Sequence, residues 1–385
     1  MAQSETTGQR LDRLLHDILI IDTHIDTPTY MLDEGYRLAE RHSYYEADIP
    51  RLRSGRVGGV FFGIYVENRD ATPGQKLERA LKCIDALREE VRRNAKDMEF
   101  ATTADDIVRI HRSGKIAAML GLEGGDMIDD SLALLRDYFR LGVRYMTLTH
   151  FKNNDWADSS TESPVHNGLT AFGRQVVQEM NQLGMMVDIS HVSDKTFYDA
   201  LAVTRAPAIA SHSDLRSICN IPRNMSDDMV RALGHNGGVV FINFNAAYVD
   251  QKVSDVFVRI HRARDRDIAA MMAANRDNPR RWEMKREIER RYLARLPKTS
   301  IKSVLNEIDR AVKIAGVDHV GVGSDFDGVS GMVPQGLEDV SKYPELIKGL
   351  IGMGYSDADI RKIMGENALR VMRANAAIAR ESAKS

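Results

Sequence analysis

Strand-like and helix-like segments alternate along most of this 385-residue chain. The strand-like segments are mostly short, nearly continuous apolar runs with β-branched residues, a pattern typical of parallel strands buried on both faces. Because eight such runs are separated by helical patterns, the sequence predicts a closed (β/α)8 barrel of the TIM type rather than an open sheet. The predicted strands are Ile18–Asp26, Val57–Val66, Ala117–Gly124, Tyr145–His150, Met185–His191, Ala206–His212, Gly238–Asn245 and Val320–Asp327. The predicted helices include Pro73–Arg93, Asp129–Leu141, Gly168–Leu183, Ser226–Gly234 and Ser300–Ala315.

A strongly charged segment, from about residue 250 to residue 298, follows the seventh predicted strand and interrupts the alternation. Interspersed Met, Ile and Ala indicate helices that are separated near Asn278-Pro279. Arg and Lys outnumber the acids, but the acids are interleaved and aromatics are few, so a solvated helical insertion is favoured over a nucleic-acid-binding arm. On the face where barrel active sites lie, it could cap a pocket or contact a second subunit. We expect residues 1–385 to form a single barrel domain that carries this insertion.

The composition excludes several classes of protein. Hydrophobic residues make up 43% of the chain, enough for a substantial core, and a net charge of -2 provides no general attraction to nucleic acid or anionic lipid. The two cysteines, Cys83 and Cys219, form no CxxC pattern, so neither a disulfide framework nor a thiolate zinc site is indicated. No apolar run reaches the ~18 residues of a membrane span. The first residues lack the apolar core of a signal peptide, so we expect a cytoplasmic protein by default, or a periplasmic one if a leader has been removed.

Polar side chains with metal-binding groups stand at the ends of the predicted strands. His24 and Asp26 end the first strand, and residues two apart on a strand point to the same face. A lone His-x-Asp match is common, and by itself a strand end that happens to be polar is the better interpretation. It is not alone, because further donors stand at other strand ends, where the active sites of barrels lie. These donors are Glu123, His150, His191, His212 and Asp325.

Some of these donors are ambiguous when taken singly. Glu123 follows a buried strand and precedes two glycines, and it could equally cap the next helix or bind a cation. For His191 or His212 alone, a hydrogen-bonded structural histidine is the better interpretation. Since both end a strand as Ser-His in adjacent units, paired ligands become the favoured one. Together with His24 and Asp26 they offer three nitrogens and two carboxylates, which suits zinc, with manganese or cobalt as substitutes. That set exceeds a single catalytic zinc site and predicts two metals that share one carboxylate.

Motifs in the same order along the chain carry a family resemblance. They are Asp22-Thr-His24-Ile-Asp26, Gly121-Leu-Glu123-Gly-Gly, Arg144-Tyr-Met-Thr-Leu-Thr-His150 with Trp156-Ala-Asp-Ser, Asp188-Ile-Ser-His191, Ser211-His212-Ser, Arg223-Asn224, Gly323-Ser-Asp325-Phe-Asp-Gly and Gly365-Glu-Asn-Ala-Leu-Arg-Val. With them the chain resembles the membrane (renal) dipeptidase family, binuclear zinc peptidases with an amidohydrolase-like barrel.

The resemblance implies a role for each matching residue. His24 and Asp26 would hold one zinc, His191 and His212 the other, and Glu123 would bridge them. His150 would bind the substrate and the oxyanion, Arg223 the terminal carboxylate with help from Tyr248, and Asp325 would carry the proton. The implied activity is hydrolysis of dipeptides with a free C-terminal carboxylate, by attack of a metal-bridging hydroxide. Two zinc ions can lower the pKa of the bridging water towards ~7, which makes this hydroxide available at neutral pH. Acceptance of a D-residue at the C-terminal position is left open, and a homodimer is expected.

Two departures from the family pattern leave substrate specificity open. Asp126 stands where family members often have His, and the insertion after Tyr248 is much longer than in the shorter relatives. One alternative is a related amidohydrolase that acts on N-acyl amino acids or β-lactams, since the same metal site would serve. A more distant alternative is a catalytically idle barrel kept as a binding or maturation protein. Lost ligands would indicate that, and every expected ligand is present.

Overall fold

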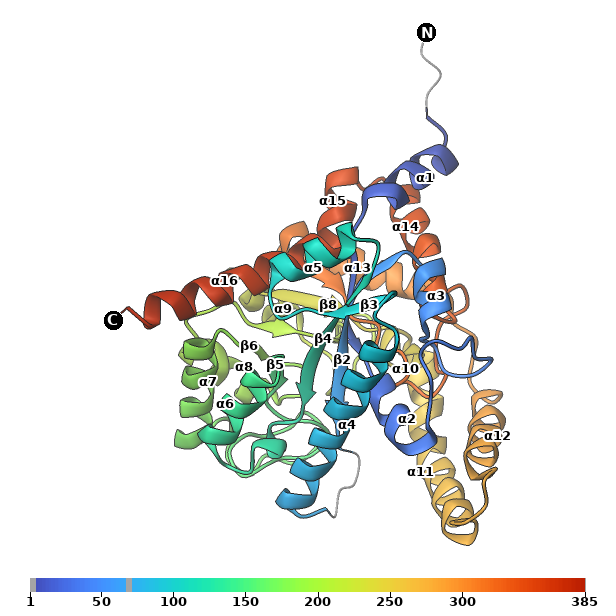
Figure 1. The fold of residues 1–385 in the computed structure, drawn as a ribbon, viewed down its shortest axis with the longest axis horizontal. Helices are drawn as coiled ribbons and strands as arrows, with labels where there is room; N and C mark the ends of the chain where they lie inside the picture. Colours follow the sequence, from blue (N-terminus) through green and yellow to red (C-terminus); the bar gives the residue numbers. More distant parts are fainter. Residues whose placement is uncertain (1–4, 67–70, 385) are drawn as a thin grey trace.

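The computed structural model describes residues 5–66 and 71–384 and shows a parallel barrel surrounded by helices (Figure 1). A nine-stranded sheet contains the eight barrel strands in the order β1-β2-β4-β5-β6-β7-β8-β9, and β3 pairs with β4 outside the ring. The strands are β1 Ile20–Ile25, β2 Val57–Tyr65, β3 Met98–Phe100, β4 Ile116–Glu123, β5 Val143–Thr147, β6 Met186–Asp188, β7 Ile209–Ala210, β8 Val239–Ile242 and β9 Val320–Val322. The α-helices are α1 Thr7–Asp17, α2 Thr27–Glu34, α3 Ile49–Ser54, α4 Pro73–Arg93, α5 Ala104–Arg112, α6 Leu132–Arg140, α7 Ala171–Leu183, α8 Asp194–Val203, α9 Asp227–His235, α10 Ala246–Val249, α11 Gln251–Ala274, α12 Arg281–Leu293, α13 Ile301–Ala315, α14 Tyr343–Gly352, α15 Asp357–Arg361 and α16 Asn367–Ser382.

The ring is nearly closed, because the segment after β9 meets the end of β1. The amide of Asp26 donates to the carbonyl of Phe326 at 2.9 Å, and the amide of Asp325 donates to the carbonyl of His24 at 3.0 Å. These bonds bring two segments about 300 residues apart in sequence into register at the C-terminal end of the barrel. The predicted TIM-type barrel is therefore confirmed.

Large and small residues alternate inside the barrel. The buried rings of Tyr145 and Phe241 lie in the interior cluster, and each occupies the space that a Cβ on Gly121 or Gly321 would fill. Glycine at these positions therefore allows an aromatic ring from the neighbouring strand to pack across the interior. At the opposite end, Leu369 of α16 packs against the same cluster. Packed side chains of this cluster therefore fill the barrel interior.

The predicted strands all exist, but most are shorter than expected, because their last residues leave the ladder. The helix expected over Asp129–Leu141 begins at Leu132. Asp129 and Asp130 adopt left-handed backbone angles (φ 47° and 49°), and Ser131 then caps the helix by accepting from the Leu134 amide. Strand β3 was not expected, and its three residues are too few for a periodic pattern.

The charged segment after β8 folds into α11 and α12, which pack against each other and project from the barrel (Figure 1, lower right). The two helices are separated at residues 275–280, where the sequence predicts the break. Arg286 of α12 anchors the pair to the barrel by an ion pair with Glu34 at 2.7 Å, and its guanidinium lies 4.1 Å from the ring centroid of Tyr44. The insertion is thus fixed beside the C-terminal end of the barrel.

Candidate metal centre and active site

A cavity of about 540 Å³ opens at the C-terminal ends of the strands. Glu123, His150 and Asp325 line it, together with Arg223 and Tyr248. Phe257 and neighbouring residues of α11 form part of the wall, so the insertion borders the cavity. The fold therefore brings together residues that the sequence places in separate loops.

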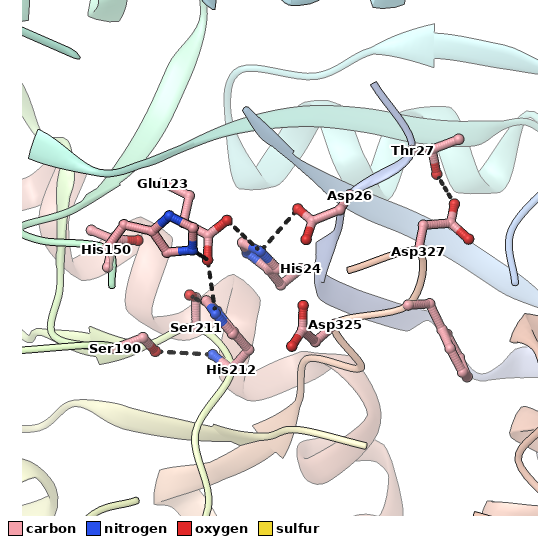
Figure 2. Close-up of polar contacts among 12 residues, drawn as sticks. His24, Asp26, Thr27, Glu123, His150, Ser190, Ser211, His212, Asp325 and Asp327 are labelled. Atoms are coloured by element: carbon pink, nitrogen blue, oxygen red, sulfur yellow. Dashed lines mark hydrogen bonds and ion pairs between the residues drawn. The ribbon is translucent and has the colours of Figure 1, made fainter. Parts of the chain in front are cut away.

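The carboxylate of Glu123, the last residue of β4, is the centre of the arrangement (Figure 2). Its Oε1 lies 3.1 Å from His191 Nε2 and 3.2 Å from His212 Nε2, and these two nitrogens are 3.0 Å apart. His150 Nε2 is 3.6 Å from the same oxygen. Glu123 Oε2 faces the other way, 3.5 Å from His24 Nε2. Each oxygen of this buried carboxylate thus faces at least one imidazole nitrogen.

His24 and Asp26 form the second half of the cluster. The Nε2 of His24 lies 3.2 Å from Asp26 Oδ1, and both side chains are buried. Asp325 faces the same space from the β9 side (Figure 2). Within the part of the chain that the structure describes, three overlapping sets have potential ligand atoms within 4.8 Å of one another: His24, Glu123 and His212; Glu123, His150 and His191; His24, Asp26 and Asp325. By this criterion His212 groups with His24, although its Nε2 is also close to that of His191.

Three polar atoms of this cluster lack hydrogen-bond partners within the protein and could instead bind a cation. His24 Nε2, Asp26 Oδ1 and Glu123 Oε2 are buried, and none of them has a hydrogen-bond partner. Buried polar atoms are normally satisfied, so three of them turned towards one small space indicate a missing positive charge. Two glycines leave room for the carboxylates to converge there. A Cβ on Gly63 would overlap Asp26, and one on Gly328 would overlap Asp26 and Asp325.

The hydrogen bonds of His24 leave its Nε2 free to bind a metal. Its Nδ1 lies 2.6 Å from the hydroxyl of Tyr145, which donates to the carbonyl of Thr23 at 3.1 Å. Since a carbonyl can only accept, the tyrosine proton is engaged there, and Nδ1 must carry the proton that it shares with the hydroxyl. The lone pair of a neutral His24 is then on Nε2, directed into the cluster.

His212 is oriented in the same way. Ser211 Oγ donates to Asp188 Oδ2 at 2.6 Å, so it accepts from His212 Nδ1 at 2.8 Å. Thr147 Oγ1 donates to the same Asp188 oxygen at 2.6 Å, which connects the ends of β5, β6 and β7. Sequence reasoning missed the orienting roles of Tyr145, Ser211 and Asp188. The available signal was Asp188 itself, a carboxylate inside an apolar strand.

The protonation states follow from burial and from the neighbouring charges. Burial lowers the pKa of His191 and His212 well below the ordinary value, so both are neutral and able to bind a metal at neutral pH. Burial alone would raise the pKa of Glu123, but the imidazoles of His150 and His24 and the hydrogen bonds from the other histidines outweigh it and hold that pKa well below its usual range. Burial raises the pKa of Asp26 well above normal. A cation would relieve that penalty on the carboxylate.

Asp325 lies beside the cluster but does not contact Glu123 directly, and a hydrogen bond from Asn243 holds its carboxyl group. Asn243 Nδ2 donates to its Oδ2 at 2.9 Å. Its backbone is left-handed (φ 61°), as is that of His191 (φ 67°), a strained conformation for both residue types that is common at functional sites. Burial raises the pKa of Asp325 to about 6, with nearby His24 opposing the shift. The carboxyl can therefore gain or lose a proton near neutral pH.

Arg223 and Tyr248 line another part of the cavity wall. The guanidinium of Arg223 is buried, donating from Nη1 to Ser213 Oγ at 2.9 Å and from Nη2 to the carbonyl of His212 at 2.6 Å. Its Nε is buried without a partner, and its Cζ lies 5.7 Å from the ring centroid of Tyr248. Arg223 is thus attached to the same loop as a candidate ligand. All the residues singled out in the sequence border one connected site.

Comparison with known proteins gives this site a family. Residues 8–385 match the family model for membrane dipeptidases, peptidase family M19. The chain is 37% identical to the dipeptidase tcpJ of Claviceps purpurea (strain 20.1), over 85% of this chain and 68% of that protein. It is 35% identical to an uncharacterized dipeptidase of Schizosaccharomyces pombe, over 99% of this chain and 86% of that protein.

A solved structure agrees with these relatives. The probable dipeptidase PvdM from Pseudomonas aeruginosa superposes with a TM-score of 0.83 at 28% identity, covering 97% of this chain and 99% of that one. No helix among the described residues is long and apolar enough to cross a membrane. The match over nearly the whole chain and the cluster of metal-binding side chains lead to one assignment. The chain belongs to the membrane dipeptidase family, peptidase family M19, and is a metal-dependent peptidase.

Proposed function

We propose that the protein is a zinc dipeptidase that cleaves dipeptides with a free C-terminal carboxylate at a centre of two zinc ions. The observation that carries the proposal is the position of Glu123, whose two oxygens face imidazoles on opposite sides, His191 and His212 on one and His24 on the other. A carboxylate in that position suits a bridge between two cations.

In this proposal His24 and Asp26 hold one ion, His191 and His212 hold the other, and Glu123 binds both. Three nitrogens and two carboxylates are a ligand set that zinc prefers. When bound, the two ions would make a water molecule acidic enough to serve as hydroxide at neutral pH and would polarise the scissile carbonyl. The tautomers set by Tyr145 and Ser211 keep the required lone pairs available without rearrangement.

Asp325 and His150 are the proposed groups for moving charge during the reaction. Asp325 would accept the proton of the attacking water and pass it to the departing amine, and its bond from Asn243 holds the carboxyl in place. Burial lowers the pKa of His150, while the Glu123 and Asp126 carboxylates oppose the shift, so the ring is neutral at neutral pH. A neutral imidazole can donate a hydrogen bond to the developing oxyanion.

Arg223 is the proposed partner of the substrate carboxylate. Two of its five N–H donors are engaged within the protein, so further donors remain for a ligand. The bonds to Ser213 and His212 fix the plane of the guanidinium relative to the metal cluster. The position of Arg223 would thus select substrates whose C-terminal carboxylate lies at a fixed distance from the scissile bond. Tyr248, beside that plane, would contact the same end of the substrate.

A substrate panel and a metal count test the proposal together. Zinc-loaded protein should hydrolyse dipeptides, including those with a D-residue at the C-terminal position, faster than N-acyl amino acids or a β-lactam. Elemental analysis of protein purified without chelator should give two metals per chain. Cleavage of N-acyl amino acids with no cleavage of dipeptides would contradict the substrate class. A stoichiometry of one after zinc reconstitution would contradict the binuclear centre. The proposal includes a homodimer, which sedimentation equilibrium measures directly.

A further inference from the structure

Asp126 lies on the wall of the active-site cavity and has no part in the proposed mechanism. It belongs to the short 3-10 helix η1, Gly125–Ile128, immediately after β4 and Glu123. Its Oδ2 accepts a hydrogen bond from Lys76 Nζ of α4 at 2.7 Å, and Lys76 also borders the cavity. Both side chains are partly exposed, 33% for Asp126 and 20% for Lys76, so a ligand in the cavity can reach them.

The Asp126 carboxylate lies over Gly124, close to His150. Gly124 has φ +122°, and a Cβ on it would lie 2.7 Å from Asp126 Oδ1 and 3.5 Å from His150 Cβ. Glycine therefore permits the carboxylate to lie beside His150. Lys76 engages only Oδ2, so the ion pair orients the carboxylate and leaves acceptor capacity on Oδ1.

The barrel order places Asp126 across the cavity from Arg223. Asp126 follows β4 and Arg223 follows β7, which is three strands further around the eight-stranded ring. Of the proposed ligands, His191 follows the intervening strand β6, whereas Glu123 ends β4 and His212 follows β7. A dipeptide with its carboxylate at Arg223 and its peptide bond at the cluster therefore extends its N-terminal residue towards the β4 side.

The α-ammonium of that residue would need an anionic partner, because it would lose water and lie near the proposed metal ions. Three of the cavity's carboxylates, Asp26, Glu123 and Asp325, belong to the metal-binding sets. The other lining carboxylates among the described residues are Asp126 and Asp265. Asp265 lies on α11 and is paired with its neighbour Arg264 at 2.9 Å. Asp126 is the carboxylate on the side where the ammonium would lie.

We propose that Asp126 binds the α-ammonium of the substrate's N-terminal residue and so selects substrates with a free amine. The inference rests on the proposed dipeptidase function and adds the recognition of the second end of the substrate. Arg223 would bind the substrate's terminal carboxylate and Asp126 its α-ammonium. This pair would restrict substrates to dipeptides and disfavour N-acylated amino acids. The residue that departs from the family pattern thus becomes a determinant of specificity.

The test compares alanyl-glycine with propionyl-glycine, which has the same shape but lacks the ammonium. Asp126→Asn keeps the side-chain volume and should reduce kcat/KM for alanyl-glycine by roughly 10- to 100-fold, mainly through KM, since a hydrogen bond between two charged groups is lost. The constant for competitive inhibition by propionyl-glycine should not change. Asp265→Asn, which removes the other lining carboxylate, is the matched control and should leave both values as in the wild type.

The possible failures are distinguishable. Equal losses for both compounds in Asp126→Asn, or the same selective loss in Asp265→Asn, would overturn the role of Asp126 while the dipeptidase function stands. Wild-type protein that binds both compounds equally well would also overturn it. Zinc-loaded wild-type protein that cleaves no dipeptide would overturn both the inference and the function on which it rests. Unchanged thermal melting and metal content show that the variants are folded.

Discussion

Replacing Gly63 by alanine tests the geometry of the metal centre, because the added methyl group would displace two candidate ligands. Gly63 lies on β2 with its Cα towards the cluster, and a methyl group there would overlap Asp26 Oδ1. The methyl would also lie 2.9 Å from Cε1 and 3.0 Å from Nε2 of His24, whereas ordinary contact begins at 3.4 Å. His24 must therefore retreat by about 0.5 Å (3.4 minus 2.9), and Asp26 by more.

A displacement of that size is large for a metal site, whose ligands need to be placed within about 0.5 Å. We expect Gly63→Ala to weaken metal binding roughly 10- to 100-fold and to lower kcat/KM for dipeptides by about 100-fold or more. The strain on the fold should be modest, about 1–3 kcal/mol in the free energy of unfolding, which is typical of overpacking. The metal-free variant should therefore still be folded.

Gly59→Ala is the matched control on the same strand. A Cβ on Gly59 would meet Met119 Cε at 3.3 Å and Ile107 Cγ2 at 3.4 Å, and the end of a methionine side chain can give way. Metal content after dialysis against graded zinc buffers, together with thermal unfolding with and without chelator, measures both variants. If Gly63→Ala binds metal as tightly as Gly59→Ala does, His24 and Asp26 do not surround the metal as we describe.

Variants at three other residues test other parts of the site. Asp325→Asn should lose most of kcat while keeping the metal content of the wild type and the melting temperature of the zinc-loaded protein, whereas a lower metal content would make Asp325 a ligand. In chelator, the effect of Asp325→Asn on the free energy of unfolding should depend on pH. Burial raises the pKa of Asp325 from 3.8 to about 6 in the folded metal-free protein, so the carboxyl's contribution to stability is full below pH ~4 and is lost as pH rises through 6. Urea unfolding should then show Asp325→Asn gaining on the wild type by up to roughly 3 kcal/mol between pH 4 and pH 8, and a constant difference would refute the reasoning. Arg223→Ala should raise KM for dipeptides strongly and abolish their preference over dipeptide amides, and a retained preference would assign the carboxylate to another residue. Tyr145→Phe removes the hydroxyl that orients His24 and should weaken zinc binding roughly 10- to 100-fold, as titration with a competing chelator would show, while unchanged affinity would show that the hydroxyl does not set the tautomer.

Local patterns in the sequence predict the architecture well. Apolar runs with β-branched residues indicate buried parallel strands, and their number and alternation with helices indicate a barrel. The element boundaries were less accurate at positions such as Asp129, where a left-handed backbone delays the helix start. Such turns depend on how the loop packs against its neighbours, and periodicity does not report that packing.

The ligand candidates could be found from the sequence because they share a position, the carboxyl end of a strand. His24, Glu123, His191 and His212 belong to four different strand ends, and a closed parallel barrel brings all such ends to one face. Sequence position was thus sufficient to assemble the set, although it does not say how far apart the atoms lie.

The sequence by itself determined the order of strands and helices, the donor residues at the strand ends and the family, since these depend on neighbouring residues and motifs. Only the tertiary structure decided which atoms meet. The barrel closure places Asp325 beside His24, Tyr145 reaches His24 from another strand, and Lys76 pairs with Asp126 from a distant helix. Each contact depends on strand register and on the packing of loops over the barrel mouth, which arise from the summed interactions of the whole fold and leave no periodic trace in the chain.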